Sequence, residues 1–202
     1  MTDERSDIIR KILAPYRSAA PSLAPEVRMR VKPKLSVDFG KATAAEIAER
    51  DRYYMSAALQ LAYAAAERGE APVGALIVMG EKIIAADFNG REEHKNALYH
   101  AEVSVISEAC EALGGWRLPG CELYVTLEPC SMCAGAIVSA RLPRVVYGAS
   151  DEKAGAYGGL YDMRSAGLNH TPEVIPGVMG EECTRLMRDF FSSKRRPAPP
   201  SR

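Results

Sequence analysis

One histidine, one glutamate and a Cys-x-x-Cys pair, placed in two separate segments, limit what this chain can fold into more than any other feature. The residues are His100, Glu102, Cys130 and Cys133. An imidazole and two thiolates suit a catalytic zinc site, in which three protein ligands leave a fourth position open for water, whereas a structural zinc site normally uses four. The fold must therefore bring the segments near residues 100 and 130 to one point.

The spacing of the two cysteines predicts that both thiols point to one site. Cys130 and Cys133 are three residues apart, so on a helix their side chains share a face. Pro129 is suited to the first turn of that helix, where unpaired N–H groups and the helix dipole favour thiolates. A redox Cys-x-x-Cys pair is the alternative, but it leaves His100 and Glu102 without a role, so we favour the metal site.

His100 and Glu102 are two residues apart, and inside a regular helix that spacing would point them to nearly opposite sides. They can share a site only if one of them occupies the cap or the first position of the helix. Glu102 would then accept a proton from a metal-activated water and deliver it to the substrate. The alternatives are a histidine satisfied by ordinary hydrogen bonds and a capping surface carboxylate.

Length and composition narrow the class of protein. The 202 residues suffice for one domain and an extension, and 26 basic residues balance 26 acidic ones. Any binding of nucleic acid must therefore come from a local patch. No apolar run approaches the roughly 20 residues that span a bilayer. The acidic N-terminus lacks a signal-peptide core, and the cysteine pattern does not suggest disulfides, so we expect no membrane association and a cytoplasmic location.

Hydrophobic periodicity predicts alternating helices and strands. The expected elements are helices at about 43–68, 100–113, 129–140 and 181–191, and strands at 74–79, 82–88, 122–127 and 144–147. Strands separated by helices predict an α/β fold with a mixed sheet and helices on its faces. Residues 46–196 are expected to form the catalytic domain and residues 197–202 a flexible tail. Residues 1–45 are expected to be a partly disordered, solvated extension, with an arm that touches RNA or a partner as the alternative.

From about residue 51 to residue 196 the sequence resembles bacterial tRNA-specific adenosine deaminases of the TadA type. The matching motifs, in order, are residues 70–75 (EAPVGA), 100–102 (HAE), 123–137 (LYVTLEPCSMCAGAI), 167–170 (GLNH) and 189–191 (DFF). Each motif alone is weak. Their shared order and spacing make the resemblance specific.

The resemblance implies a cytidine-deaminase-like three-layer αβα sandwich, with a five-stranded mixed sheet and helices on both faces, usually as a homodimer. It implies one zinc ion per subunit held by His100, Cys130 and Cys133, with Glu102 as the proton shuttle. The implied reaction is hydrolytic deamination of adenosine to inosine at the wobble position of a tRNA anticodon, with the ACG arginine tRNA as the expected substrate. An anticodon loop already presents unpaired bases, so turning one into a pocket costs less than opening a duplex.

The resemblance also assigns substrate contacts. Asn89 should hydrogen-bond the adenosine, and Val73 should form part of the apolar wall beside the base. Asp151, Asn169 and His170 should lie near the flanking nucleotides of the loop. Alternatively, Val73 is ordinary core, and Asn169 and His170 form a turn.

The resemblance also suggests roles for C-terminal residues. Phe190 or Phe191 is expected to support the closing C-terminal helix. The basic residues Lys194, Arg195 and Arg196 are expected to meet phosphates. Just before the ligand histidine the family often has Asp, a small residue, Thr and Ala, whereas this chain has Asn96-Ala97-Leu98-Tyr99. That departure affects the approach to the pocket rather than the zinc site.

Two other functions remain open from the residues. A small-molecule deaminase acting on a purine or pyrimidine such as guanine, cytosine or a nucleotide would share the zinc core. The sequence of residues 127–136 and the later motifs favour the tRNA enzyme. A non-catalytic zinc module that binds RNA or a partner has no use for the spare carboxylate of Glu102.

Overall fold

The computed structural model describes residues 4–17 and 39–195. The helices are α1 (Glu4–Leu13), η1 (Ala14–Arg17), α2 (Ala44–Glu67), α3 (Arg91–His94), α4 (Ala101–Leu113), α5 (Ser131–Ser139), η2 (Met163–Ala166) and α6 (Gly180–Lys194). The strands are β1 (Gly74–Met79), β2 (Lys82–Phe88), β3 (Cys121–Leu127), β4 (Arg144–Ala149) and β5 (Glu173–Ile175). Within the described ranges, no helix combines the length and apolar character needed to cross a bilayer.

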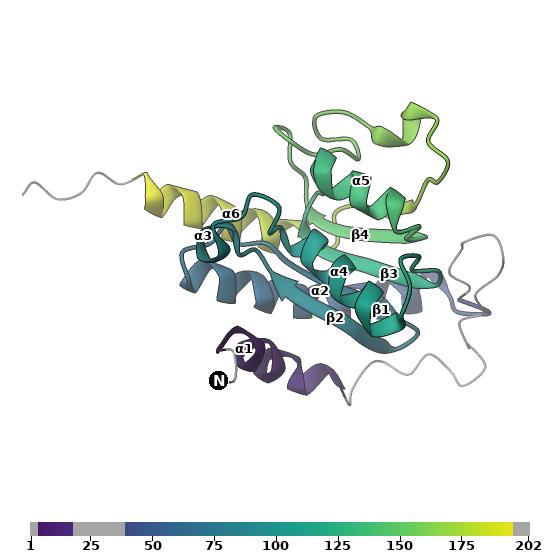
Figure 1. Cartoon of the computed structure of the whole chain (residues 1–202), viewed down its shortest axis with the longest axis horizontal. Helices are drawn as coiled ribbons and strands as arrows, with labels where there is room; N and C mark the ends of the chain where they lie inside the picture. Colours follow the sequence, from purple (N-terminus) through teal and green to yellow (C-terminus); the bar gives the residue numbers. More distant parts are fainter. Residues whose placement is uncertain (1–3, 18–38, 196–202) are drawn as a thin grey trace, which may run out of the picture.

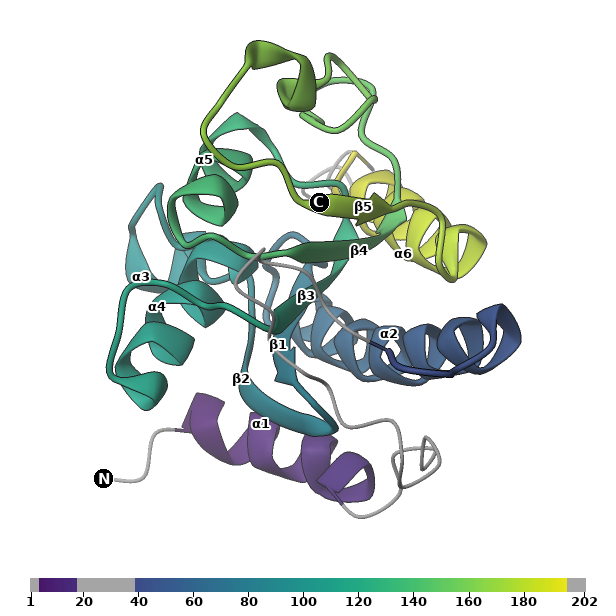
Figure 2. The ribbon, with the colours of Figure 1, turned by 90° about the vertical axis from the view of Figure 1, so that its right-hand side faces the viewer.

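The five strands form one mixed sheet in the order β2-β1-β3-β4-β5. Strand β1 runs antiparallel to both β2 and β3, whereas β3, β4 and β5 run parallel to one another. Helices α4 and α5 cover one face and α2 and α6 cover the other, as Figures 1 and 2 show. The predicted three-layer αβα sandwich with a five-stranded mixed sheet is confirmed.

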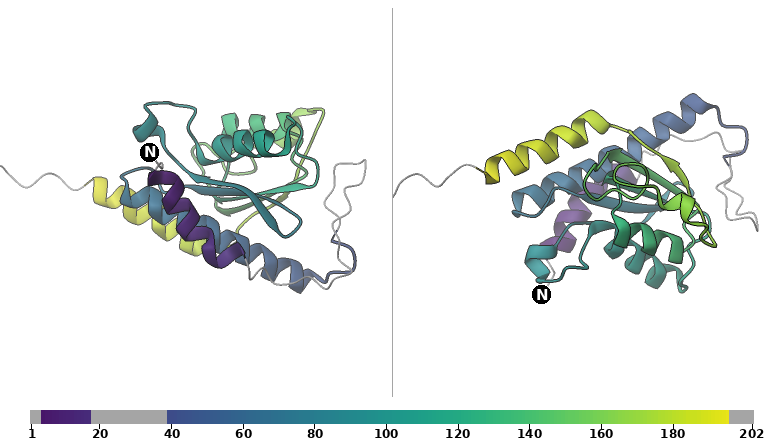
Figure 3. Two further views of the ribbon diagram at one scale, coloured as in Figure 1. Left: turned by 60° about the horizontal axis from the view of Figure 1, so that its bottom comes forward. Right: turned by 90° about the horizontal axis from the view of Figure 1, so that it is seen from above.

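Both faces of the central strands are buried, so these strands are almost continuously apolar. Along β1, Ala75 and Ile77 belong to the core shared with α4 and α5. The alternate residues Leu76 and Val78 belong to the core beneath α2 and α6. This period of two assigns each side chain to one of two cores. Figure 3 shows the helices that cover the two faces on opposite sides of the sheet.

The long helix α2 begins where the sequence predicts. Thr43 is its N-cap: the Thr43 side chain accepts from the Glu46 amide, and the Glu46 carboxylate accepts from the Thr43 amide. This capping box satisfies two of the amides that a helix start leaves unpaired. The helix ends before Gly69, whose φ of +79° lies in the left-handed region that glycine adopts freely.

Three expected boundaries need correction. Pro129 does not start α5; the helix begins at Ser131 with Cys130 as its N-cap. The Pro129 carbonyl instead accepts a hydrogen bond from the amide of Ala156, which holds this residue in an extended connection. Strand β5 is not among the strands expected from hydrophobic periodicity, because its three residues are too few to show a period. Helix α6 extends three residues beyond its predicted end at Phe191.

Residues 4–17 are an ordered part of the expected N-terminal extension and are packed against the domain. Helix α1 packs against α2 and β2, with Leu13 only 5% exposed and Ile8, Ile9 and Ile12 packed against the same core. The amphipathic pattern of these isoleucines was the sequence signal for this packing. Residues 18–38 and 197–202 lie outside the described residues, so the predictions made for them stay predictions.

A network of charged side chains is buried between α2 and the start of β3 and β4. Arg144 pairs with Asp51 at 2.7 Å and with Glu122 at 2.8 Å, and Arg50 pairs with the other oxygen of Glu122 at 2.6 Å. The Tyr124 hydroxyl donates to Asp51 at 2.9 Å. The two arginines and two carboxylates are at most 3% exposed, so each charge depends on its partners for solvation.

Removing Arg144 should destabilise the fold strongly. Arg144→Met leaves Asp51 and Glu122 short of a buried cationic partner and should lower the free energy of unfolding by about 3–5 kcal/mol. Urea unfolding at neutral pH measures this change. Arg52→Met, at an exposed position of α2 next to Asp51, is the control and should change stability by less than about 0.5 kcal/mol. Equal unfolding midpoints for the two variants would contradict the role of the network.

Candidate active site

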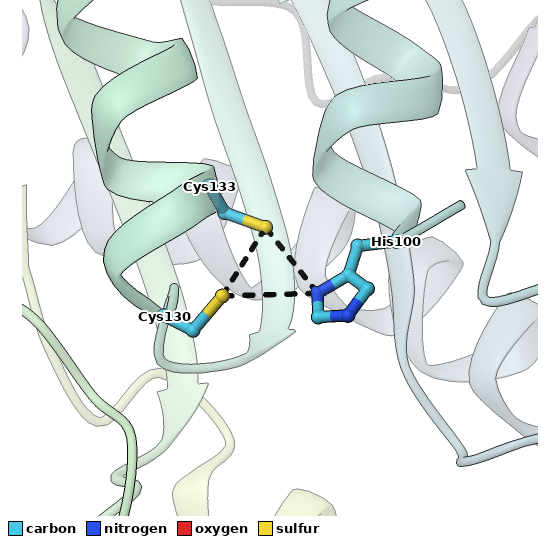
Figure 4. A group of neighbouring side chains, drawn as sticks. All are labelled: His100, Cys130 and Cys133. Atoms are coloured by element: carbon cyan, nitrogen blue, oxygen red, sulfur yellow. Dashed lines mark hydrogen bonds between the residues drawn. The ribbon is translucent and has the colours of Figure 1, made fainter. Parts of the chain in front are cut away.

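The N-termini of α4 and α5 meet at one edge of the sheet. His100 is the N-cap of α4 and Cys130 is the N-cap of α5, each with extended backbone angles. Helix α4 leads back across the sheet into β3, and α5 follows directly from the other end of β3, so both helices begin at the same edge. Figure 4 shows the resulting convergence of His100, Cys130 and Cys133.

The three donor atoms are spaced as a metal ion requires. His100 Nδ1 lies 3.5 Å from Cys133 Sγ and 3.8 Å from Cys130 Sγ, and the two sulfurs are 3.7 Å apart. A tetrahedral ion with zinc-like bonds of about 2.3 Å to sulfur and about 2.0–2.1 Å to nitrogen places two sulfurs about 3.8 Å apart and sulfur and nitrogen about 3.6 Å apart. Among the described residues this is the one cluster with ligands so placed.

The electrostatics of the metal-free cluster favour one thiolate. Hydrogen bonds from Cys133 and His100 lower the pKa of Cys130 to about 3. The neighbouring Cys130 sulfur and burial raise the pKa of Cys133. The two sulfurs thus share a proton that a bound dication would displace, because a metal takes cysteine as the thiolate.

Glu102 lies against this cluster. His100 occupies the cap of α4, which is one of the arrangements that allow two residues with this spacing to share a site. Glu102 is the second residue of α4, is 3% exposed and interacts with His100, Cys130 and Cys133. Burial raises the pKa of Glu102. A carboxyl group in this position can both hold and release a proton at the metal-binding edge.

Val73 and Asn89 form a second wall of the same edge. The amide of Asn89, which follows β2, donates to the carbonyl of Val73, which precedes β1, at 2.8 Å. The side-chain Nδ2 of Asn89 donates to Glu70 Oε2 at 2.9 Å. Val73 packs in the same apolar cluster as Ala101, the first residue of α4. The structure therefore brings these two predicted substrate contacts to the start of α4.

Asp151 is held beside the cluster by a residue that the sequence analysis did not single out. Glu128 is 2% exposed and its carboxylate accepts the amides of Asp151, Tyr157 and Gly159 at 2.9–3.0 Å. Cys130 forms an isolated β-bridge with Gly155 in the same loop. The glycines of residues 155–159 were the available signal, because a Cβ at Gly155 or Gly159 would overlap the Glu128 carboxylate.

Asn169 and His170 are not brought to the donor cluster. Asn169 Oδ1 accepts from Arg141 at 2.8 Å, and the buried His170 donates to the Leu142 carbonyl at 2.6 Å. Both partners lie beyond the C-terminal end of α5, whereas the cluster lies at its N-terminal end. The nine residues of α5 separate these ends by about 13 Å. Their local contacts are those of the turn that the sequence left as the alternative, and their contact with substrate stays a prediction.

Gly155→Ala should disturb the loop that carries Asp151. A Cβ at Gly155 would overlap the Glu128 carboxyl group and lie 2.6 Å from the Asp151 carbonyl oxygen. We expect a loss of about 1–3 kcal/mol in the free energy of unfolding, typical of overpacking. Urea unfolding again measures the change. In Gly135→Ala, the control, the added Cβ meets no atom within 4 Å, and this helical position should gain about 0.5–1 kcal/mol. Equal stability of the two variants would show that the loop can shift away from the added methyl group without lowering the free energy of unfolding.

Comparison with known proteins identifies the class. A model of the MafB19-like deaminase family matches residues 49–195, and the chain belongs to this family of deaminases. A tRNA-specific adenosine deaminase of Bacillus subtilis (strain 168) is 47% identical over 148 residues, which cover 73% of this chain and 92% of that protein. The protein of the same name from Agrobacterium fabrum (strain C58) is 45% identical over 150 residues, which cover 74% and 98%.

Solved structures agree with this assignment. A structure from a study of A-to-I editing by tRNA:A34 deaminases is 44% identical, with a TM-score of 0.62, and covers 66% of this chain and 98% of that chain. The match supports the cytidine-deaminase-like fold and the resemblance to tRNA adenosine deaminases stated from the sequence. Guanine deaminase from Nitrosomonas europaea, at 21% identity and a TM-score of 0.62 over 84% of this chain and 90% of that one, shares the fold alone.

Proposed function

We propose that this deaminase converts adenosine to inosine at the wobble position of a tRNA anticodon, using one zinc ion held by His100, Cys130 and Cys133. The main support for this substrate is the sequence identity of 47% and 45% to proteins named tRNA-specific adenosine deaminases. The spacing of the three donor atoms and their chemistry, one imidazole and two thiols, support the zinc. By the same relationship we expect a homodimer, a cytoplasmic location and the ACG arginine tRNA as substrate.

The reaction adds water at C6 of adenine and releases ammonia. When bound, zinc would supply Lewis acidity that lets water ionise near neutral pH. Glu102 takes the proton that the attacking water loses and passes it to N1 of the base. It then takes the proton of the new C6 hydroxyl group and passes it to the departing amino group, so that the C6–N6 bond breaks and the C6 carbonyl of inosine and ammonia are formed. The buried position of Glu102 suits this transfer, because burial raises its pKa and lets the carboxyl group hold the proton between steps.

The residues of the second wall would hold the base. Glu70 fixes one N–H of the Asn89 amide, which leaves its carbonyl oxygen and second N–H for the adenosine. Val73 offers an apolar surface beside them. Asp151 lies on the loop across the cluster and would meet a flanking nucleotide, as would Asn169 and His170 on a more distant part of the RNA.

The fold leaves the substrate open, because a guanine deaminase shares it at 21% identity. An assay of inosine formation decides between the two classes. Purified zinc-loaded protein should convert the wobble adenosine of an ACG arginine tRNA transcript and leave free adenosine and guanine unchanged. The same transcript with guanosine at the wobble position is the matched control. Deamination of a free base or nucleotide, with the tRNA untouched, would replace this proposal by a small-molecule deaminase.

Metal analysis tests the ligand set independently of substrate. The purified chain should contain one zinc ion, and His100→Ala should lose most of it because only two protein ligands remain. Gel filtration and circular dichroism check that the variant is folded. Cys110→Ala, which removes a cysteine outside the cluster, should keep the full zinc content. Full zinc occupancy in His100→Ala would overturn the ligand assignment.

Glu102→Gln should separate metal binding from turnover. The variant keeps the shape of the side chain and all three ligands but cannot transfer the proton, so kcat should fall at least about 10²–10⁴-fold. Zinc content should equal that of the wild type. Glu111→Gln, at an exposed position of the same helix, is the control and should retain full activity. Full turnover by Glu102→Gln would refute the proposed proton path.

A further inference from the structure

Helix α1 lies outside residues 49–195 that match the deaminase family, yet its Arg5 reaches the wall of the active site. In Figure 3, α1 lies alongside α2 on the outer side of the sheet, next to the edge strand β2. The segment that follows β2 carries Asn89 and leads through α3 to His100. The contacts of Arg5 therefore connect an added element to the residues proposed to hold the base and the metal.

The guanidinium of Arg5 contacts the end of β2 and the segment that leads from it to His100. Its guanidinium pairs with Asp87 at 2.7 Å and with Glu93 at 2.9 Å. It also donates to the carbonyl of Phe88 and lies 3.8 Å from the centre of the Phe88 ring and 5.4 Å from that of Tyr99. Arg5 is 4% exposed, so these charge interactions are shielded from solvent.

Asp87 continues the connection to α4. Besides Arg5, the Asp87 carboxylate accepts the amide of Phe88 at 2.8 Å and the hydroxyl of Ser104. The amide of Ser104 in turn donates to the carbonyl of His100 at 3.0 Å, within the first turn of α4. Arg5 thus neutralises the buried carboxylate that fastens the end of β2 to the helix whose cap is His100.

Glu93 continues the connection to Asn89. The amide of Glu93 donates to Glu70 Oε1 at 2.7 Å, while Glu70 Oε2 accepts the Asn89 side chain at 2.9 Å. The Glu93 carboxylate binds Arg5 and also Arg68, the latter at 2.9 Å. The position of α3 therefore depends on both arginines, and the position of the Asn89 amide depends on the same Glu70 that holds α3.

The segment is packed tightly where Arg5 enters it. A Cβ at Gly90 would lie 2.9 Å from both His94 and Tyr99 and 3.0 Å from the Arg5 guanidinium. The rings of His94 and Tyr99 stack at 3.7 Å with an angle of 18°. A small shift of the His94 or Tyr99 ring toward Gly90 would thus press on the backbone at Gly90 and its neighbour Asn89.

We propose that Arg5 is a positioning residue of the active site: through Asp87 and Glu93 it holds the segment from Phe88 to Tyr99 in the arrangement that presents Asn89 to the substrate and His100 to the metal. The inference rests on the proposed function for the meaning of "substrate", but its structural part concerns the zinc-loaded enzyme alone. A helix attached only for stability needs a contact such as that of Leu13. Arg5 adds a fork of charged hydrogen bonds aimed at one functional segment.

Steady-state kinetics test the positioning role at a temperature well below the unfolding transition of each variant. Arg5→Met should lower kcat/KM for wobble deamination by about 10- to 100-fold, the scale of a misplaced binding group. Arg5→Lys keeps the charge but not the fork, and should recover part of the loss. Arg10→Met, on the exposed face of the same helix, is the matched control and should retain wild-type kcat/KM. Wild-type kcat/KM in folded Arg5→Met would overturn the proposal.

Amide hydrogen exchange on the zinc-loaded enzyme without RNA tests the same coupling apart from the reaction. Arg5→Met should speed exchange in residues 88–100 more than in the central strand β3, with zinc content unchanged. Glu93→Gln keeps the pair of Arg5 with Asp87 and should produce a smaller effect in the same segment, which guards against a variant that fails to fold. Unchanged exchange in residues 88–100 for both variants would overturn the proposal, even if the enzyme deaminates tRNA. If the wild-type enzyme fails to deaminate tRNA but Arg5→Met still speeds exchange in residues 88–100, only the proposed function is overturned.

Discussion

The convergence of two helix N-termini is the constraint on which the rest of this structure depends. His100 and Cys130 are both N-caps, and Cys133 lies one turn into α5, so three donors meet only if α4 and α5 start side by side. Strand β3 ensures this, since it joins the end of α4 to the start of α5 across the full depth of the sheet. Both helix dipoles then point their positive ends at the cluster, which favours thiolates and any other anionic group there. The apolar residues that bury α4 and α5 on one face of the sheet therefore also set the distances among the donors.

Two buried carboxylates extend this constraint to the walls of the site. Glu70 accepts the side-chain amide of Asn89 and two backbone amides at the start of α3, and Glu128 accepts three amides of the loop that begins at Asp151. A buried carboxylate is costly unless hydrogen bonds replace its water, and each here receives three. The exchange favours one conformation of each loop, because any other leaves a charge without donors. Irregular segments thereby gain the fixed geometry that a binding site needs while they stay at the edge of the sheet.

The sequence predicted the parts of this molecule that rest on local rules. The start of the first long helix near Thr43, the hairpin strands at 74–79 and 82–88, and the requirement that His100 or Glu102 lie at a helix cap or first position each follow from a few adjacent residues, and each is found in the structure. The features it missed rest on contacts between distant residues. Pro129 is suited to the start of a helix but precedes it, with its carbonyl bound by the distant amide of Ala156, and β5 is recognised only by its pairing with β4. The amphipathic isoleucines of α1 indicate a helix with one buried face, but they do not identify the surface that covers it.

The residues proposed to hold the metal and those proposed to contact the substrate therefore lie in different parts of the fold. The donor cluster depends on the sheet and two helices, an arrangement shared in outline even with a guanine deaminase at 21% identity. The approach to it depends on Asn89, the segment before His100 and the loop at Asp151, all of which are irregular. It is in this second set that the chain departs from its family resemblance, with Asn96-Ala97-Leu98-Tyr99. Tyr99 stacks on His94 and lies within reach of the Arg5 guanidinium, so the unusual residue and the added helix contact one another.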